Sequence, residues 1–185
     1  MEAKAEFAAA YLNRFNEGFA KNTAEIVIKK GEQESLYAFA VAKNADIYFA
    51  KTKVEKEQLI FRAAYVLEYI YFNYATDFLP YKQRFINDAL QTENSSCKRH
   101  FLKILVHILS NNEISPKQKN SIAETALEWL CEKNQKVAVK VWAMNILSLL
   151  KSELDWLQEI WADVEAVATQ NITAAIKVRV RRGWK

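Results

Sequence analysis

The stretch Ser115-Pro116-Lys117-Gln118 carries the strongest structural signal in this chain of 185 residues. Serine is a preferred N-cap, proline suits the first position of a helix, and glutamine three residues after the cap completes a capping box. The hydrophobic periodicity then continues to about Lys133. The stretch therefore predicts a long helix over about 116–133.

Working outward, the rest of the chain is poor in the residues that make turns. It contains 3 Gly and 2 Pro, whereas average usage would give roughly 13 and 9. Strands need turns, and turns depend on Gly, Pro, Asn or Asp to reach their dihedral angles. The composition therefore predicts an all-α protein, with more than two thirds of its residues helical, about nine or ten helices and no sheet.

Capping residues and apolar periodicity give approximate bounds for the other helices. Asn22 or Thr23 can cap a short helix that ends at Gly31, a residue suited to the left-handed C′ position. Ser95 or Ser96 can cap a later one. The expected helices cover about 3–20, 24–30, 34–43 (or to 51), 54–74, 78–91, 95–109, 116–133, 136–151, 153–170 and 172–182.

Short polar turns join these helices in pairs, which gives antiparallel neighbours. A basic residue recurs near the start of the first helix of each pair, at Arg62, Arg99, Lys140 and Lys177. The intervals of about 37 to 41 residues lie at or just below the short end of the roughly 40 to 47 residues typical of HEAT and armadillo repeats.

Two segments resemble the first helix of a HEAT repeat, Arg99-His-Phe-Leu-Lys-Ile-Leu-Val and Lys140-Val-Trp-Ala-Met-Asn-Ile-Leu. The resemblance extends from about residue 57 to the end. It implies an α-α superhelix, a short solenoid of antiparallel helix pairs, with Trp142 and Leu147 in the core between pairs. We expect one domain over 1–185, with 1–55 as an N-terminal cap. The alternative is a non-repetitive helical bundle.

The net charge and the distribution of apolar residues indicate the compartment and the partners of the protein. The net charge of +4 is too small to imply a nucleic-acid partner by itself. The N-terminus lacks the apolar core of a signal peptide, and Arg62 and Glu68 interrupt the apolar run at 59–74. Two cysteines make no disulfide framework. These features predict a cytoplasmic protein that does not span a membrane.

Few side chains are spaced as a metal site or a catalytic site would require. Cys97 and His100 share a helix face, and Cys131 could approach them to form a zinc site. We favour the simpler interpretation of two half-buried thiols and a surface histidine. The only other histidine, His107, lies too far along the helix to join one ion. We therefore predict no metal site, no cofactor and no catalytic residue, which argues against an enzyme.

The leading hypothesis is a non-enzymatic protein-interaction or scaffold module. Helical solenoids present an extended concave binding surface, which we assign to the second helix of each pair. The expected groove residues are Tyr81, Lys82, Phe85, Lys117, Lys119, Glu124, Glu128, Trp156 and Asp163.

The middle of the chain has a surplus of basic residues at Lys98, Arg99, Lys103, Lys117, Lys119, Lys133, Lys136 and Lys140. In this it resembles the HEAT-like DNA alkylation-repair glycosylases, which bind DNA in a basic groove, so the alternative function is nucleic-acid binding. A basic patch ends the sequence: Lys177, Arg179, Arg181, Arg182 and Lys185. Either it contacts phosphates, or the acidic helix at 153–170 neutralises it. In both cases Ile172, Ile176 and Val180 should dock on the preceding pair. The sequence leaves partner identity and oligomeric state open.

Overall fold

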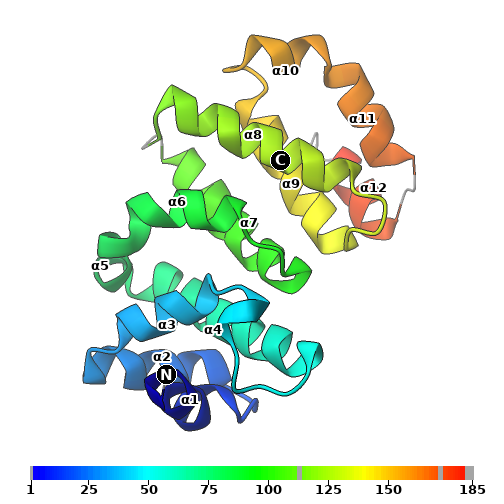
Figure 1. The fold of residues 1–185 in the computed structure, drawn as a ribbon. Coiled ribbons are helices and arrows are strands. Elements are labelled where there is room, and N and C mark those ends of the chain that lie inside the picture. Colours follow the sequence, from blue (N-terminus) through cyan, green and yellow to red (C-terminus); the bar gives the residue numbers. More distant parts are fainter. Residues whose placement is uncertain (1, 112–113, 171–172, 182–185) are drawn as a thin grey trace. The chain divides into compact units, whose positions relative to one another are not determined.

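The structure, a computed structural model, describes residues 2–111, 114–170 and 173–181. In this part of the chain more than two thirds of the residues are helical and none lies in a strand, as the composition predicted (Figure 1). The contacts divide the chain into two compact units, Met1–Phe101 and Leu102–Lys185, with the boundary inside α7 (Ser95–Ser110). The single domain with residues 1–55 as an N-terminal cap stays a prediction.

The first unit is built around its longest helix, α4 (Lys53–Asn73), which packs against α2 (Phe19–Lys30) and α3 (Gln33–Ala40). The remaining elements are α1 (Glu2–Phe7), a π-helix (Ala8–Leu12), a 3₁₀ turn (Asn44–Asp46), α5 (Ala75–Phe78), a second 3₁₀ turn (Leu79–Tyr81) and α6 (Lys82–Leu90).

The expected helix over 3–20 is wrong, because the chain stops being helical after Leu12. Arg62 of α4 explains the break: its guanidinium donates to the carbonyl oxygens of Leu12 at 2.7 Å and Asn13 at 3.2 Å. These bonds satisfy backbone groups that a continuing helix would have used. The next helix starts at Phe19, after Gly18 with φ of 73°. Asn22 and Thr23 therefore lie inside α2 and do not cap it.

Gly31 ends α2 as predicted. Its φ is 70°, in the left-handed region. The Gly31 N–H donates to the Ile28 carbonyl and the Glu32 N–H donates to the Val27 carbonyl, which is the Schellman pattern.

The helix expected over 78–91 consists of three pieces. Pro80 lies in the 3₁₀ turn between α5 and α6, because proline has no N–H to donate within a continuous helix. Similarly, α3 ends at Ala40, short of the expected 43 or 51.

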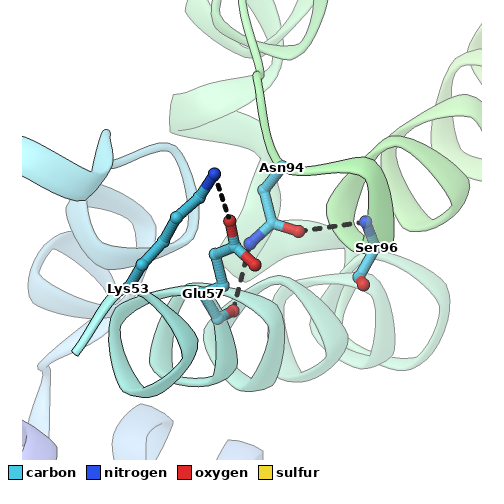
Figure 2. Close-up of polar contacts among 4 residues, drawn as sticks. All are labelled: Lys53, Glu57, Asn94 and Ser96. Atoms are coloured by element: carbon cyan, nitrogen blue, oxygen red, sulfur yellow. Dashed lines mark hydrogen bonds and ion pairs between the residues drawn. The ribbon is translucent and has the colours of Figure 1, made fainter.

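Asn94, and not the expected Ser95 or Ser96, caps α7 (Figure 2). Its Oδ1 accepts the Ser96 N–H at 3.0 Å, and its Nδ2 donates to the Glu57 carbonyl of α4 at 3.0 Å. Lys53 pairs with the Glu57 carboxylate at 3.6 Å on the same surface. One side chain thus starts α7 and ties that start to α4.

In the second unit, α8 (Pro116–Cys131) and α9 (Val137–Leu150) pack along each other. The predicted capping box is present: the Ser115 hydroxyl accepts the Gln118 N–H, and the Gln118 side chain accepts the Ser115 N–H. The helix expected over 153–170 is divided at Ile160 into α10 (Asp155–Glu159) and α11 (Trp161–Thr169).

The last described helix, α12 (Ala174–Arg181), packs on α9, and α11 packs on α8. Ile176 is buried as expected. Val180 is 38% exposed, so its predicted docking is wrong, and Ile172 lies outside the described residues.

The two core positions predicted on α9, Trp142 and Leu147, differ in their burial. Leu147 is fully buried, which confirms that prediction. Trp142 is half-buried, on the same side of α9 as the exposed Ala138 and Leu149. The same described part of the chain holds no helix with the length and apolarity needed to cross a bilayer.

We predict that Asn94→Ala lowers the free energy of unfolding by about 1–2 kcal/mol, because it removes the cap of α7 and the bond to α4. Asn94→Asp keeps the capping acceptor but loses the donor to Glu57, so its loss should be smaller. Urea unfolding measures both. Asn87→Ala, at an exposed position on α6, is the control, and an equal loss there would contradict the assignment.

Candidate partner-binding surfaces

The first candidate surface lies on α3 and α6 of the first unit. The Tyr37 and Tyr81 rings stack with centroids 4.8 Å apart. The Arg84 guanidinium lies 4.2 Å from the Tyr37 ring centroid and 4.9 Å from that of Tyr81. Glu34 accepts a hydrogen bond from Arg84 at 2.6 Å. We call Glu34, Tyr37, Tyr81 and Arg84 the tyrosine–arginine cluster.

Two further side-chain hydrogen bonds hold this cluster and its surroundings in place. The Tyr37 hydroxyl donates to Asp88 Oδ2 at 2.7 Å, and the Gln33 amide donates to Asp77 Oδ1 at 2.9 Å. The Tyr37 side chain is buried, whereas Arg84 and Glu34 keep 45% and 66% of their side-chain surface exposed. The arginine is therefore held in place while it still faces solvent.

The environment of the cluster shifts the pKa values of its titratable groups. Burial, followed by the hydrogen bond to Asp88, raises the pKa of the Tyr37 hydroxyl well above its ordinary value of 10.0. Burial also raises the pKa of Tyr81. The hydrogen bond to Glu34 raises the pKa of Arg84. Both tyrosines thus stay neutral and the arginine stays charged.

Of the groove residues predicted in this unit, Tyr81 and Lys82 are half-buried on the surface. Phe85 is fully buried, with its ring 5.4 Å from Phe78 and 5.3 Å from Phe101. Phe85 therefore belongs to the core and is not available to a partner. The prediction missed Arg84 and Asp88, although they lie three and seven residues after Tyr81 and so share its helix face.

The second candidate surface lies on α8, α10 and α11 of the second unit. Lys119 forms an ion pair with Glu153, and the Trp156 indole N–H donates to Asn120 Oδ1 at 2.9 Å. These contacts hold the start of α10 against α8. The other residues predicted for the groove here, Lys117, Glu124, Glu128 and Asp163, are all exposed. That these residues bind a partner stays a prediction.

The predicted basic patch is only partly described. Lys177 and Arg181 are exposed on α12, four residues apart on one face. Neither forms an ion pair with any carboxylate in the described part of the chain. The Arg179 side chain, Arg182 and Lys185 lie outside the described residues. Whether the patch contacts phosphates stays untested.

The cysteines and histidines make no metal centre that the structure describes. Cys97 is fully buried in the first unit, and Cys131 is exposed in the second. Within residues 2–111, 114–170 and 173–181, no three His, Cys, Asp or Glu side chains gather as a metal site would require.

His100 is fully buried, so the expectation of a surface histidine is wrong. Its Nδ1 lies 2.5 Å from Glu68 Oε2 of α4, and the rings of Phe61 and Tyr65 flank it. Its Nε2 is buried without a hydrogen-bond partner in the described residues. One feature of the sequence could have indicated this pair: Glu68 interrupts an apolar run, and a buried carboxylate needs a partner.

A cavity of about 280 Å³ lies between the π-helix, residues 49–50 and α4, with Arg62 in its wall. It falls just below the roughly 300–1,000 Å³ of small-molecule sites. Because Arg62 already bonds two carbonyl groups, we attribute the cavity to the break at Leu12.

Comparison with known proteins gave one family match. A family model described as a HEAT repeat domain matches residues 28–185. The match begins within α2, earlier than the resemblance expected from residue 57. No curated protein and no solved structure matches the chain.

We predict that Tyr37 contributes a pH-dependent part of the stability. Its folded pKa is raised, so its contribution is complete below pH 10 and is lost as the pH rises further, by about 1.4 kcal/mol per unit. Tyr37→Phe should unfold with a shallower alkaline dependence than the parent in urea titrations from pH 8 to 11. Tyr48→Phe, at an exposed tyrosine, should match the parent. Identical alkaline slopes in all three would refute the account.

We predict that Glu68→Ala lowers the free energy of unfolding by about 3–5 kcal/mol, because it leaves the buried His100 unpaired. The double variant Glu68→Leu with His100→Phe should lose less free energy of unfolding than the sum of the losses from Glu68→Leu and His100→Phe alone. The reason is that the double variant removes both polar groups. Chemical denaturation of all the variants measures the coupling, and simple additivity would argue against the buried pair.

Proposed function

Because the chain belongs to the HEAT repeat domain family, we propose that it is a non-enzymatic interaction module whose second-helix surfaces bind a protein partner. The tyrosine–arginine cluster is the observation that carries the proposal. Tyr and Arg are enriched among the residues that dominate binding energy at protein interfaces. Side chains that are ordered before binding also lose less conformational entropy when a partner docks.

The surroundings of the cluster support this function. Leu79, in the 3₁₀ turn beside Tyr81, is 64% exposed. A partner that covers Leu79 would remove apolar surface from water next to a fixed cation. Arg84 would then supply the charged hydrogen bonds that set orientation.

A photo-crosslinking residue at position 79 tests the proposal in the native cell. We expect it to capture a discrete partner, and a crosslinker at Ile26, an exposed position on α2, should not. The partner is then purified and its affinity measured directly.

We predict that Arg84→Ala weakens that affinity at least tenfold, while the stability changes by no more than about 1 kcal/mol. Lys21→Ala is the matched control, because Lys21 is also an exposed cation in a surface ion pair, with Glu25. Equal capture from positions 26 and 79, or unchanged binding by Arg84→Ala, would exclude this surface.

A further inference from the structure

The cavity of about 280 Å³ beside α4 lies within the first unit and combines an apolar wall with a few polar groups. The apolar wall consists of Ala5, Ala8, Phe49, Ala50 and Leu59. Such a combination is typical of small-molecule sites, where the polar groups orient the ligand. The volume suits a ligand smaller than a drug-sized molecule.

The polar wall of the cavity is one stripe of α4. Glu55, Gln58 and Arg62 all line the cavity, and residues three, four and seven positions apart share a helix face. Among the described residues of the lining, Glu55 and Arg62 are the only charged ones. Seven residues of an α-helix rise about 10.5 Å, so the stripe carries a carboxylate at one end and a guanidinium at the other.

Arg62 keeps hydrogen-bond donors for a ligand. Its bonds to the Leu12 and Asn13 carbonyl oxygens both come from Nη1. A guanidinium has five N–H donors, so three N–H groups on Nη2 and Nε have no acceptor among the described residues. Nor does Arg62 form an ion pair in this part of the chain. The fold thus positions the guanidinium and leaves it able to bind a carboxylate.

Hydrogen bonds also position Glu55 at the other end of the stripe. Its Oε2 accepts the N–H groups of Thr52 at 3.0 Å and Lys51 at 2.8 Å. These backbone hydrogen bonds, that of Thr52 first, lower the pKa of Glu55, so its carboxylate stays charged at neutral pH. Within the described residues no group donates to Oε1 of Glu55. This oxygen can therefore accept from a ligand amine.

The Gln58 side chain lies between the two charges. It is exposed and has no hydrogen-bond partner in the described part of the chain. A carboxamide can both donate to and accept from a peptide unit. An extended chain covers at most about 3.3–3.6 Å per residue, so the charged ends of a tripeptide lie roughly 10 Å apart, as Glu55 and Arg62 do along the helix. A simple anion or cation would use only one of these charges.

We propose that this cavity binds a free tripeptide with small side chains, whose amino group pairs with Glu55 and whose carboxylate pairs with Arg62. Gln58 bonds the main chain of the peptide, and the apolar wall contacts its side chains. The site shares no residue with the tyrosine–arginine cluster, so either proposal can fail without the other.

Isothermal titration calorimetry of the full chain with Ala-Ala-Ala tests the proposal. We expect a dissociation constant below about 1 mM. The N-acetylated and the C-amidated tripeptides should each bind at least about tenfold more weakly, because each loses one charged hydrogen bond. Absence of binding by Ala-Ala-Ala would overturn the proposal. Undiminished binding of the N-acetylated form would overturn it in favour of a site for the C-terminus of a protein chain.

Two variants separate binding from folding. Glu55→Gln keeps the acceptor of the capping box but removes the charge, so it should weaken binding of Ala-Ala-Ala about tenfold with little change in melting temperature. Gln58→Ala should weaken binding about threefold to tenfold. The matched controls are Glu25→Gln on α2 and Gln83→Ala on α6, at exposed positions outside the cavity. If either variant bound the tripeptide as tightly as its control, the assignment of that side chain would be wrong.

Discussion

The pairing of helices along their apolar sides is the constraint on which the rest of this structure depends. An isolated helix of the length of α8 or α9 is marginal in water, and α9 is apolar at nearly every position. Packing on α8 buries one side of α9 and packing of α12 covers another. Lys140 and Asn145 thus lie within an almost wholly apolar helix, the first half-buried and the second buried.

In the first unit the same constraint acts through α4. Its central turns are buried by α2 and α3, and the two polar residues in its apolar run each have a specific partner. Arg62 ends the π-helix, and Glu68 meets His100. Residues that looked like interruptions of a hydrophobic segment are thus points where α4 joins the elements around it.

Sequence reasoning succeeded where the determinants are local. The Ser115 capping box and the Gly31 terminus each depend on a few consecutive residues, and both were placed correctly. The break after Leu12 depends on Arg62, about fifty residues away, and the tyrosine–arginine cluster depends on α3 meeting α6. Periodicity alone also left open which face of a helix is buried, so Phe85, which is fully buried, was assigned to a binding surface.

The separation of acidic and basic helices in the second unit also has a long-range consequence. Negative charge on α10 and α11 and positive charge on α9 and α12 give this unit an electric dipole moment. A charged body approaching in solution exerts a torque on such a dipole before any side chains touch. At physiological ionic strength the Debye length is about 8 Å, so this orientation acts only during the final approach and accelerates encounters most in dilute salt.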